Sequence, residues 1–219
     1  YKFIKPVADK SKVVSFDIFD TVLFRRDSST GSRLTDPDQM FFLMEQKHEI
    51  TGFANNRLSC ESVLRQLTYS HDNTSAFREI TLDGIYKLMD PKFAPIQDME
   101  INWEIENVIP NEPMVDVFHK IRLSGKPIIF TSDMYLNADT ITKMLQNIGI
   151  SPDDYMKLYL SSQIGKTKWH GRLYPHIHHD LKIKPTEIVH IGDNREFDYK
   201  NARDANWRAL WYNNGKIHA

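Results

Sequence analysis

The sequence of 219 residues has one cysteine, no long hydrophobic run and no excess of charge of either sign. Cys60 has no second cysteine to pair with, which excludes an intramolecular disulfide and favours a reducing compartment. The longest apolar runs, such as residues 126–131, are far shorter than the ~20 residues that a membrane helix needs. We therefore expect a soluble, cytoplasmic protein without a membrane span.

Charge is balanced, with 28 basic and 29 acidic residues and a formal net charge of -1. Such a chain has no basic field that would attract nucleic acid or an anionic membrane, so we expect neither as a partner. The N-terminus lacks the hydrophobic region of a secretory signal. Because the chain does not begin with methionine, we expect it to be a segment of a longer protein.

A hydrophobic content of 41% allows a real core, and the length predicts one large domain or one domain with an insertion. Short apolar runs alternate with helical patterns, which is typical of a parallel sheet with crossover helices. The sequence therefore predicts an α/β fold with a Rossmann-like parallel sheet and helices on both faces. The predicted strands are residues 13–16, 127–131, 158–160, 187–191 and 208–212, with helices at 114–121 and 141–148.

The region from about residue 27 to residue 110 departs from this alternation, because it shows several helical patterns without a strand between them. A helical insertion after the first strand would cover the strand ends like a lid. We therefore predict an α/β core of residues 1–27 together with 111–219, and a helical lid of residues 28–110. The expected helices are 36–47, 58–69, 82–89 and 97–107, with loops at 70–75 and 90–95.

An aspartate, Asp17, follows the first predicted strand directly. A carboxylate at the end of a buried strand is costly unless a cation or hydrogen-bond donors await it. Asp17 is therefore either a functional group at the edge of the sheet or a turn residue that caps the next helix.

Two more acids follow the fourth predicted strand, Asp193 directly after Gly192 and Asp198 five residues later. Gly192 is expected to let the backbone turn tightly. Three carboxylates that meet at one edge of a sheet repel one another, and a hard dication with oxygen ligands removes that repulsion. The alternative is structural ion pairing with Arg195 or Arg203.

Ser132 and Asp133 follow the second predicted strand. The Ser132 hydroxyl and the neighbouring backbone N–H groups are suited to bind an oxyanion. Lys168, which comes after the third strand, offers a compact positive charge beside that anion. A single serine or lysine is usually a surface residue, so the prediction depends on their order after successive strands of one sheet.

In this order the residues resemble the four motifs of the haloacid dehalogenase superfamily, over nearly the whole chain. The helical region after the first motif resembles the family's lid, called the cap. The first motif is matched by Asp17 with Thr21, the second by Ser132, the third by Lys168 and the fourth by Asp193 with Asp198.

The resemblance implies phosphoryl transfer from a small phosphorylated substrate. Asp17 would attack phosphorus and form an aspartyl-phosphate, which water then hydrolyses, with Ser132 and Lys168 as the other catalytic residues. Phosphate would be bound by Thr21, Ser132, Asp133 and Lys168. Mg²⁺ would be held by Asp17, Asp193, the backbone carbonyl of Phe19 and Asp198, which alternatively holds Lys168.

Phe19 departs from the family's pattern, because its phosphatases carry a second aspartate there as general acid and base. The absence of this aspartate should lower the reaction rate about 10²–10⁴-fold for a poor leaving group. Three explanations are open. Asp20 substitutes for the acid; or the substrate has an acidic leaving group, such as a phosphate anhydride, sugar nucleotide or acyl phosphate; or the domain binds phosphorylated ligands without turning them over.

An aromatic residue at this position also occurs in the dehalogenases that name the superfamily, which need no magnesium. A 2-haloacid dehalogenase is therefore a further alternative, although Asp193 and Asp198 argue against carbon–halogen chemistry. Residues 15–21 and 132–136 resemble more narrowly a bacterial subgroup that occurs beside, or fused to, glycosyltransferases of surface polysaccharide synthesis. That implies a glycosyltransferase partner and a sugar- or nucleotide-linked substrate, or a weak or inactive module with a structural or ligand-binding role.

Two further features have open interpretations. Arg25 and Arg26 either reach an anionic substrate at the entrance of the lid or have a hinge or surface role. Trp169, next to Lys168, either packs against the protein or faces the substrate.

Overall fold

The computed structural model describes residues 1–70, 79–213 and 215–218. A six-stranded sheet forms its centre, with the strand order β5-β4-β1-β6-β7-β8. The first five strands in this order run parallel, and β8 is antiparallel to β7. The strands are β1 (Val13–Phe16), β4 (Ile128–Ser132), β5 (Lys157–Leu160), β6 (Ile188–Gly192), β7 (Arg208–Asn213) and β8 (Lys216–His218).

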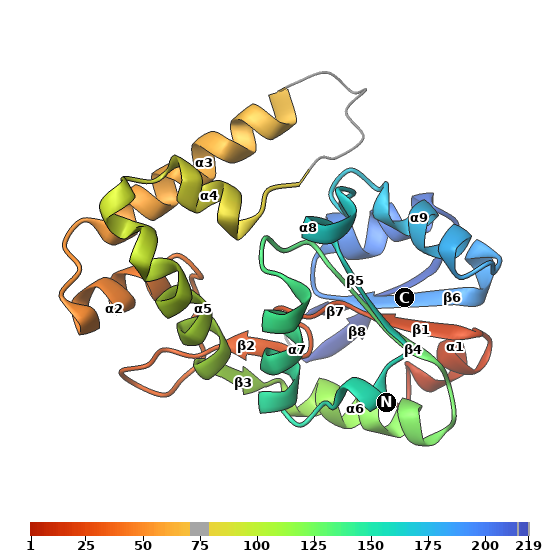
Figure 1. Cartoon of the computed structure of the whole chain (residues 1–219). Helices are drawn as coiled ribbons and strands as arrows, with labels where there is room; N and C mark the ends of the chain where they lie inside the picture. Colours follow the sequence, from red (N-terminus) through yellow and green to blue (C-terminus); the bar gives the residue numbers. More distant parts are fainter. Residues whose placement is uncertain (71–78, 214, 219) are drawn as a thin grey trace.

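Helices cover both faces of the sheet (Figure 1). Successive side chains of a strand point to opposite faces, so β1 contributes Val14 and Phe16 to one apolar layer and Val13 to the other. The first layer includes α6 (Glu112–Leu123) and α7 (Ala138–Asn147), and the second includes α9 (Leu173–Asp180) and the short α10 (Asn201–Asp204). The predicted α/β fold class is confirmed.

The five predicted strands are all present, with shifts of one residue at some ends. Ser132 and Gly192 are the last residues of β4 and β6, whereas the sequence placed them just after the strands. The elements that the sequence analysis did not predict are short, which leaves no periodic pattern to read. Outside the segment between β1 and α6, they are α1 (Lys5–Asp9), η2 (Pro152–Asp154), α8 (Ser161–Ile164), η3 (Pro185–Glu187), η4 (Arg195–Lys200), α10 and β8.

Strand β1 lies at the point where the strand order reverses. The chain continues from β1 to its neighbour β4 on one side, and later returns to pair β6 on the other side. In open α/β sheets the crevice for ligands lies at the carboxyl ends of the strands at such a point. Asp17, which follows β1, is therefore placed where this architecture forms its site.

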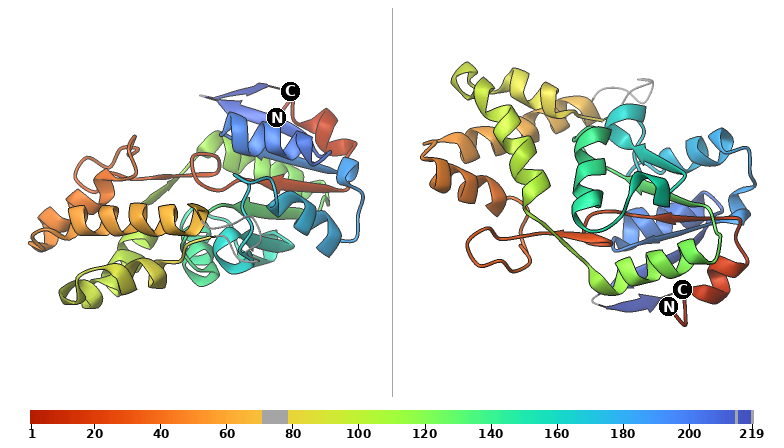
Figure 2. Two further views of the ribbon diagram at one scale, coloured as in Figure 1. Left: turned by 90° about the horizontal axis from the view of Figure 1, so that it is seen from above. Right: turned by 60° about the horizontal axis from the view of Figure 1, so that its bottom comes forward.

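Between β1 and α6 the chain leaves the sheet through an antiparallel pair, β2 (Leu23–Arg25) and β3 (Val108–Pro110). Four helices lie beyond this pair, on the side of the carboxyl ends of the parallel strands (Figures 1 and 2). They are α2 (Gln39–His48), α3 (Phe53–Ser70), α4 (Leu82–Leu88) and α5 (Gln97–Glu106), all close to the predicted helices.

Two expectations for this region were wrong. A region without strands was expected, but β3 forms at its end because three residues pair with β2 across more than eighty positions of sequence, which no local pattern shows. The loop expected at 90–95 is the 3-10 helix η1 (Pro91–Ile96), started by the Asp90 side chain, which accepts the N–H of Lys92. Of the loop expected at 70–75, residue 70 ends α3 and the others lie outside the described residues.

We propose that residues 28–110 are the cap and that residues 1–27 with 111–219 are the core. The two chain crossings run side by side in β2 and β3, where Phe24 lies opposite Ile109. The predicted boundaries fall shortly after β2 and directly after β3, so β2 belongs to the core and β3 to the cap. None of the helices among the described residues is both long and apolar enough to cross a bilayer.

A buried ion pair joins the cap helices. The Arg57 guanidinium of α3 donates to the Glu100 carboxylate of α5 at 2.9 to 3.1 Å, and both side chains are fully buried. Tyr86 of α4 also donates to Glu100, at 2.7 Å. Removing one partner of such a pair leaves a buried charge without compensation.

We expect Arg57→Met to lower the free energy of unfolding by about 3–5 kcal/mol, because Glu100 would lose its counter-charge inside the cap. Urea unfolding followed by circular dichroism measures this. Lys5→Met is the matched control, since Lys5 pairs with Asp9 on the surface and such pairs contribute little. Equal stability of Arg57→Met and the wild type would contradict the prediction.

Candidate active site

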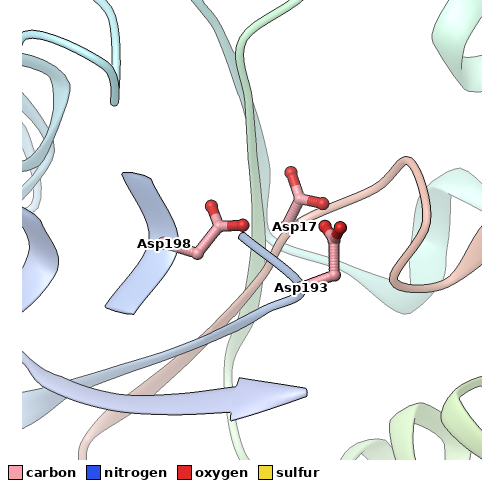
Figure 3. A group of neighbouring side chains, drawn as sticks. All are labelled: Asp17, Asp193 and Asp198. Carbon is pink, nitrogen blue, oxygen red and sulfur yellow. The ribbon is translucent and has the colours of Figure 1, made fainter. Parts of the chain in front are cut away.

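Three carboxylates come together at the carboxyl edge of the sheet. Asp17 follows β1, Asp193 follows β6, and Asp198 lies in the π-helix η4. One oxygen of each lies within 4.8 Å of the other two (Figure 3). Asp17 and Asp198 are buried and Asp193 is half-buried. The structure thus brings together the three acids that the sequence singled out.

One ammonium group lies among these carboxylates. Nζ of Lys168 is 2.5 Å from Oδ1 of Asp17 and 2.5 Å from Oδ1 of Asp198, and its side chain is buried. Burial acts to lower the pKa of Lys168, but the carboxylates of Asp17 and Asp198 outweigh it and raise the pKa. Lys168 is therefore a permanent cation that bridges two acids.

The single cation does not compensate all three acids. Burial raises the pKa of Asp17 well above its usual range against the opposing effect of Lys168, and burial with the Asp198 charge raises that of Asp193 to about 6. Asp198 differs, because Lys168 and His190 overcome its burial and lower its pKa. The cluster thus carries an excess of negative charge around Asp17 and Asp193.

The donor set fits Mg²⁺, which prefers carboxylate and carbonyl oxygens. Asp17 and Asp193 offer oxygens whose charge is poorly compensated. Asp198 is already occupied, since Oδ1 accepts from Lys168 and His190 while Oδ2 accepts the N–H of Asn194 at 2.9 Å. The two alternatives for Asp198 are therefore unequal, and its contacts favour holding Lys168 over direct ligation.

Among the described residues, neither Arg195 nor Arg203 forms the ion pair with these acids that was the alternative interpretation. Arg195 lies over the ring of Trp211, and Arg203 donates to the hydroxyl of Tyr199. Gly192 also has a different role from the one expected. Its φ is outside the left-handed region, but a Cβ on it would stand 2.4–2.5 Å from the Asp198 side chain. Glycine is needed there for close approach and not for a tight turn.

Two of the residues predicted to bind phosphate, Thr21 and Ser132, lie near Asp17. The Thr21 hydroxyl is 3.0 Å from Oδ2 of Asp17 and 3.3 Å from Oδ1 of Asp193. Ser132 is buried at the end of β4, which pairs with β1. These positions are consistent with the predicted roles, which stay predictions.

Asp133 holds the loop that carries Lys168. Its carboxylate accepts the backbone N–H groups of Lys168 at 2.8 Å and of Trp169 at 3.0 Å. The Asn201 amide donates to the carbonyls of the same two residues. A carboxylate would repel phosphate, so the phosphate contact predicted for Asp133 can only come from its backbone N–H.

No protein-family model matches this sequence, and no curated protein sequence matches it. Solved structures match it over most of its length. The HAD-hydrolase YfnB from Bacillus subtilis, in a form bound to magnesium, covers 92% of this chain and 88% of its own, with a TM-score of 0.61 and 13% identity. The protein has the haloacid dehalogenase fold.

Two other structures with this fold illustrate its range. A haloacid dehalogenase-like hydrolase from Bacteroides fragilis covers 91% of this chain and 86% of its own, with a TM-score of 0.55 and 18% identity. The match to the L-2-haloacid dehalogenase from Xanthobacter autotrophicus covers 91% of this chain and 76% of that chain, with a TM-score of 0.57 and 16% identity. Sequence identities this low show that the fold is shared. They do not show that the reaction is shared, so the reaction has to be argued from the residues of the site.

In this haloacid dehalogenase fold, the position expected to hold a general acid is covered by a cation. The Arg25 guanidinium lies 4.6 Å from the centroid of the Phe19 ring. Two hydrogen bonds of 2.7 and 2.8 Å tie Arg25 to Glu104 of α5. Asp20, in the left-handed region with φ 59°, instead pairs with Arg33 at 2.8 Å near the surface. The carboxylate of Asp20 is therefore engaged in an ion pair, and this pair lines a pocket together with Asp193.

Arg25, Arg26 and Trp169 connect the cap to the core. Arg26 donates to the backbone of Glu106 at the end of α5, next to the Arg25–Glu104 pair, which favours the hinge interpretation. The Trp169 ring, half exposed, stacks edge-on against Tyr69 of α3 with ring centroids 4.8 Å apart.

A cavity of about 240 Å³ lies between the cap and the core. Phe19 and Asp133 line it from the core, while Phe41 and Arg65 line it from the cap. Phe19 and Asp133 lie within two residues of Asp17 and Ser132.

Three residues were missed by the sequence analysis: His190, which contacts Asp198, and Ser15 and Thr131, which are linked to His190 by hydrogen bonds. His190 lies 3.1 Å from Asp198 through Nε2 and 2.8 Å from Ser15 through Nδ1. Thr131 continues the contacts at 2.8 Å from Ser15. A signal was available, because each is a polar residue inside an otherwise apolar strand.

We expect Gly192→Ala to weaken Mg²⁺ binding at least tenfold, because the added Cβ would displace the Asp198 side chain that holds Lys168. Isothermal titration calorimetry measures the affinity. Gly149→Ala is the control, since its φ of 84° strains the backbone at a position where a Cβ meets nothing. A loss of stability in both variants with unchanged Mg²⁺ affinity would refute the role given to Gly192.

Proposed function

We propose that the protein is a Mg²⁺-dependent phosphohydrolase or phosphotransferase that acts through an aspartyl-phosphate on Asp17. Its substrate is a small phosphorylated metabolite, sugar- or nucleotide-linked. The observation that carries the proposal is the meeting of Asp17 and Asp193, short of positive charge, beside a Lys168 that is itself held by Asp198. The neighbours with this fold, which are named as hydrolases, support it.

In the first step an oxygen of Asp17 attacks phosphorus, and the bond from phosphorus to the leaving-group oxygen breaks with its electron pair on that oxygen. Thr21 holds Oδ2 of Asp17, which limits rotation of the nucleophile. Lys168 exchanges its contact with Asp17 for a phosphate oxygen and keeps its contact with Asp198. The ammonium then stabilises charge on the transferring group.

In the second step water, or an acceptor hydroxyl, attacks the phosphorus of the aspartyl-phosphate. The bond to Asp17 breaks, the carboxylate is restored and the attacking oxygen loses its proton to solvent. Bound Mg²⁺, held by Asp17, Asp193 and the Phe19 carbonyl, would supply Lewis-acid stabilisation of the phosphate charge. Ser132 and the backbone N–H of Asp133 bind the remaining phosphate oxygens.

The environment of Phe19 favours a substrate with an acidic leaving group. The place of the usual acid holds an apolar ring under Arg25, and Asp20 is engaged with Arg33. A phosphate anhydride, sugar nucleotide or acyl phosphate needs little protonation as it leaves, so its cleavage tolerates this site. We therefore prefer this explanation to the use of Asp20 as acid.

A 2-haloacid dehalogenase is the second candidate, because solved dehalogenases share the fold and Phe19 is aromatic. The carboxylate cluster favours the metal-dependent reaction. The third candidate is a weak or inactive module with a structural or ligand-binding role in a larger polysaccharide-synthesis protein. We further propose that the protein is located in the cytoplasm and has a fused or neighbouring glycosyltransferase as its partner.

We expect the wild type to hydrolyse 4-nitrophenyl phosphate only with Mg²⁺, and Asp17→Asn to lower kcat by about 10³-fold or more, because the amide cannot act as the nucleophile. Asp116→Asn on the surface is the matched control. A wild type that binds Mg²⁺ and phosphate without turnover would refute the enzymatic proposal and favour the inactive module. Halide release from a 2-haloacid without Mg²⁺ would establish the dehalogenase.

The missing acid predicts a steep dependence on the leaving group. We expect kcat/KM for an acyl phosphate to exceed that for an alkyl phosphate by about 10²–10⁴ beyond the difference seen with an aspartate at position 19. The comparison enzyme is Phe19→Asp, measured on both substrates at saturating Mg²⁺. If the variant and the wild type show the same ratio, another residue already supplies the proton.

A further inference from the structure

A chain of buried polar side chains runs beneath the carboxylate cluster. The Thr131 hydroxyl lies 2.8 Å from that of Ser15, and the latter lies 2.8 Å from Nδ1 of His190. Nε2 of His190 lies 3.1 Å from Oδ1 of Asp198. These four side chains are at most 1% exposed, so solvent does not complete their hydrogen bonds.

This row of hydrogen-bonded side chains crosses three neighbouring strands in the centre of the sheet. Thr131 lies on β4, Ser15 on β1 and His190 on β6, and Ser15 is directly opposite His190 in the strand register. The surrounding layer is apolar, with Val13, Ile129 and Ile188 at the alternate positions of the same strands. Apolar side chains would pack here without the desolvation cost of polar ones, so packing alone does not explain the chain.

The end at Asp198 sets the direction of the hydrogen bonds. An ionised carboxylate only accepts, so the Nε2 atom of His190 carries the proton that it donates to Asp198. In the neutral ring Nδ1 then accepts the Ser15 hydroxyl, and the Ser15 oxygen accepts that of Thr131. Burial lowers the pKa of His190, which agrees with a neutral ring.

This arrangement restrains the carboxylate on which Lys168 depends. Asp198 accepts hydrogen bonds from three donors, which are His190, Lys168 and the backbone N–H of Asn194. The His190 ring is itself held edge-on against the Tyr174 ring, with centroids 5.5 Å apart. Without His190, Asp198 could rotate, and Lys168 would move fully onto Asp17 and neutralise the nucleophile.

We propose that His190, backed by Ser15 and Thr131, is a positioning residue that fixes the Asp198 carboxylate and thereby keeps Lys168 shared between Asp198 and the nucleophile. His190 is fully buried and acts only through Asp198. The expected effect of His190 on turnover rests on the proposed function. The expected effects of His190 on hydrogen bonding and on Mg²⁺ binding can be measured without turnover.

The test compares His190→Leu, which removes the donor, with His190→Gln, whose amide N–H can reach the place of Nε2. For His190→Leu we expect kcat on an aryl phosphate to fall about 10–100-fold with little change in KM, and the Kd of Mg²⁺ to rise about tenfold as Lys168 competes for Asp17. His190→Gln should recover most of both. Ser15→Ala, which leaves His190 in place, should give a smaller loss.

Ile188→Val is the matched control, because it removes one methyl group from the same apolar layer without touching the polar chain. It should lower Tm and leave kcat and the Mg²⁺ affinity unchanged. The inference is overturned if His190→Leu behaves in the same way, since His190 would then have only a structural role.

Nitrogen-15 NMR of the histidine rings gives a result that is independent of catalysis. We expect His190 in the wild type to carry its proton on Nε2, and a proton on Nδ1 alone would overturn the inference. If the wild type turns over no phosphate ester, the proposed function fails. The ring tautomer and the Mg²⁺ affinities of the two His190 variants then decide the positioning role separately.

Discussion

One buried ammonium group, Nζ of Lys168, lies between the carboxylates of Asp17 and Asp198, and the arrangement of the site depends on it. A single positive charge cannot compensate three acids that meet at a sheet edge, so it stabilises Asp198 most and leaves Asp17 and Asp193 with excess negative charge. That imbalance is costly in the protein alone and becomes favourable when a divalent cation binds. The same contacts hold the ammonium of Lys168 next to the carboxylate of Asp17.

Much of the surrounding structure serves to hold this lysine. The loop that carries Lys168 is fixed through its N–H groups by Asp133 and through its carbonyls by Asn201. Asp198 can approach because residue 192 has no side chain, and it is held from below by His190. Hydrogen bonds from three strands and a π-helix thus restrain one amino group, as expected for a site that must be organised before substrate arrives.

The cap determines a second property of the site, which is the surroundings of Phe19. Arg25 covers Phe19 and is fixed by Glu104 of the cap helix α5, so the environment at this position is an apolar ring under a neutralised guanidinium. The cavity between cap and core opens at this place. In the proposed function this lining favours a substrate whose leaving group needs little protonation.

The sequence by itself determined the α/β fold class, its five main strands and the acids Asp17, Asp193 and Asp198, because buried strands and the polar residues at their ends leave a local pattern. Only the tertiary structure decided three other features. These are strand β3, the ion pair of Asp20 with Arg33, and the role of Gly192 in the close approach of Asp198. The tertiary structure also decided the link from His190 to Lys168. Each of these depends on contacts between residues distant in the chain, and a linear pattern carries no information about which distant side chains will share one charge.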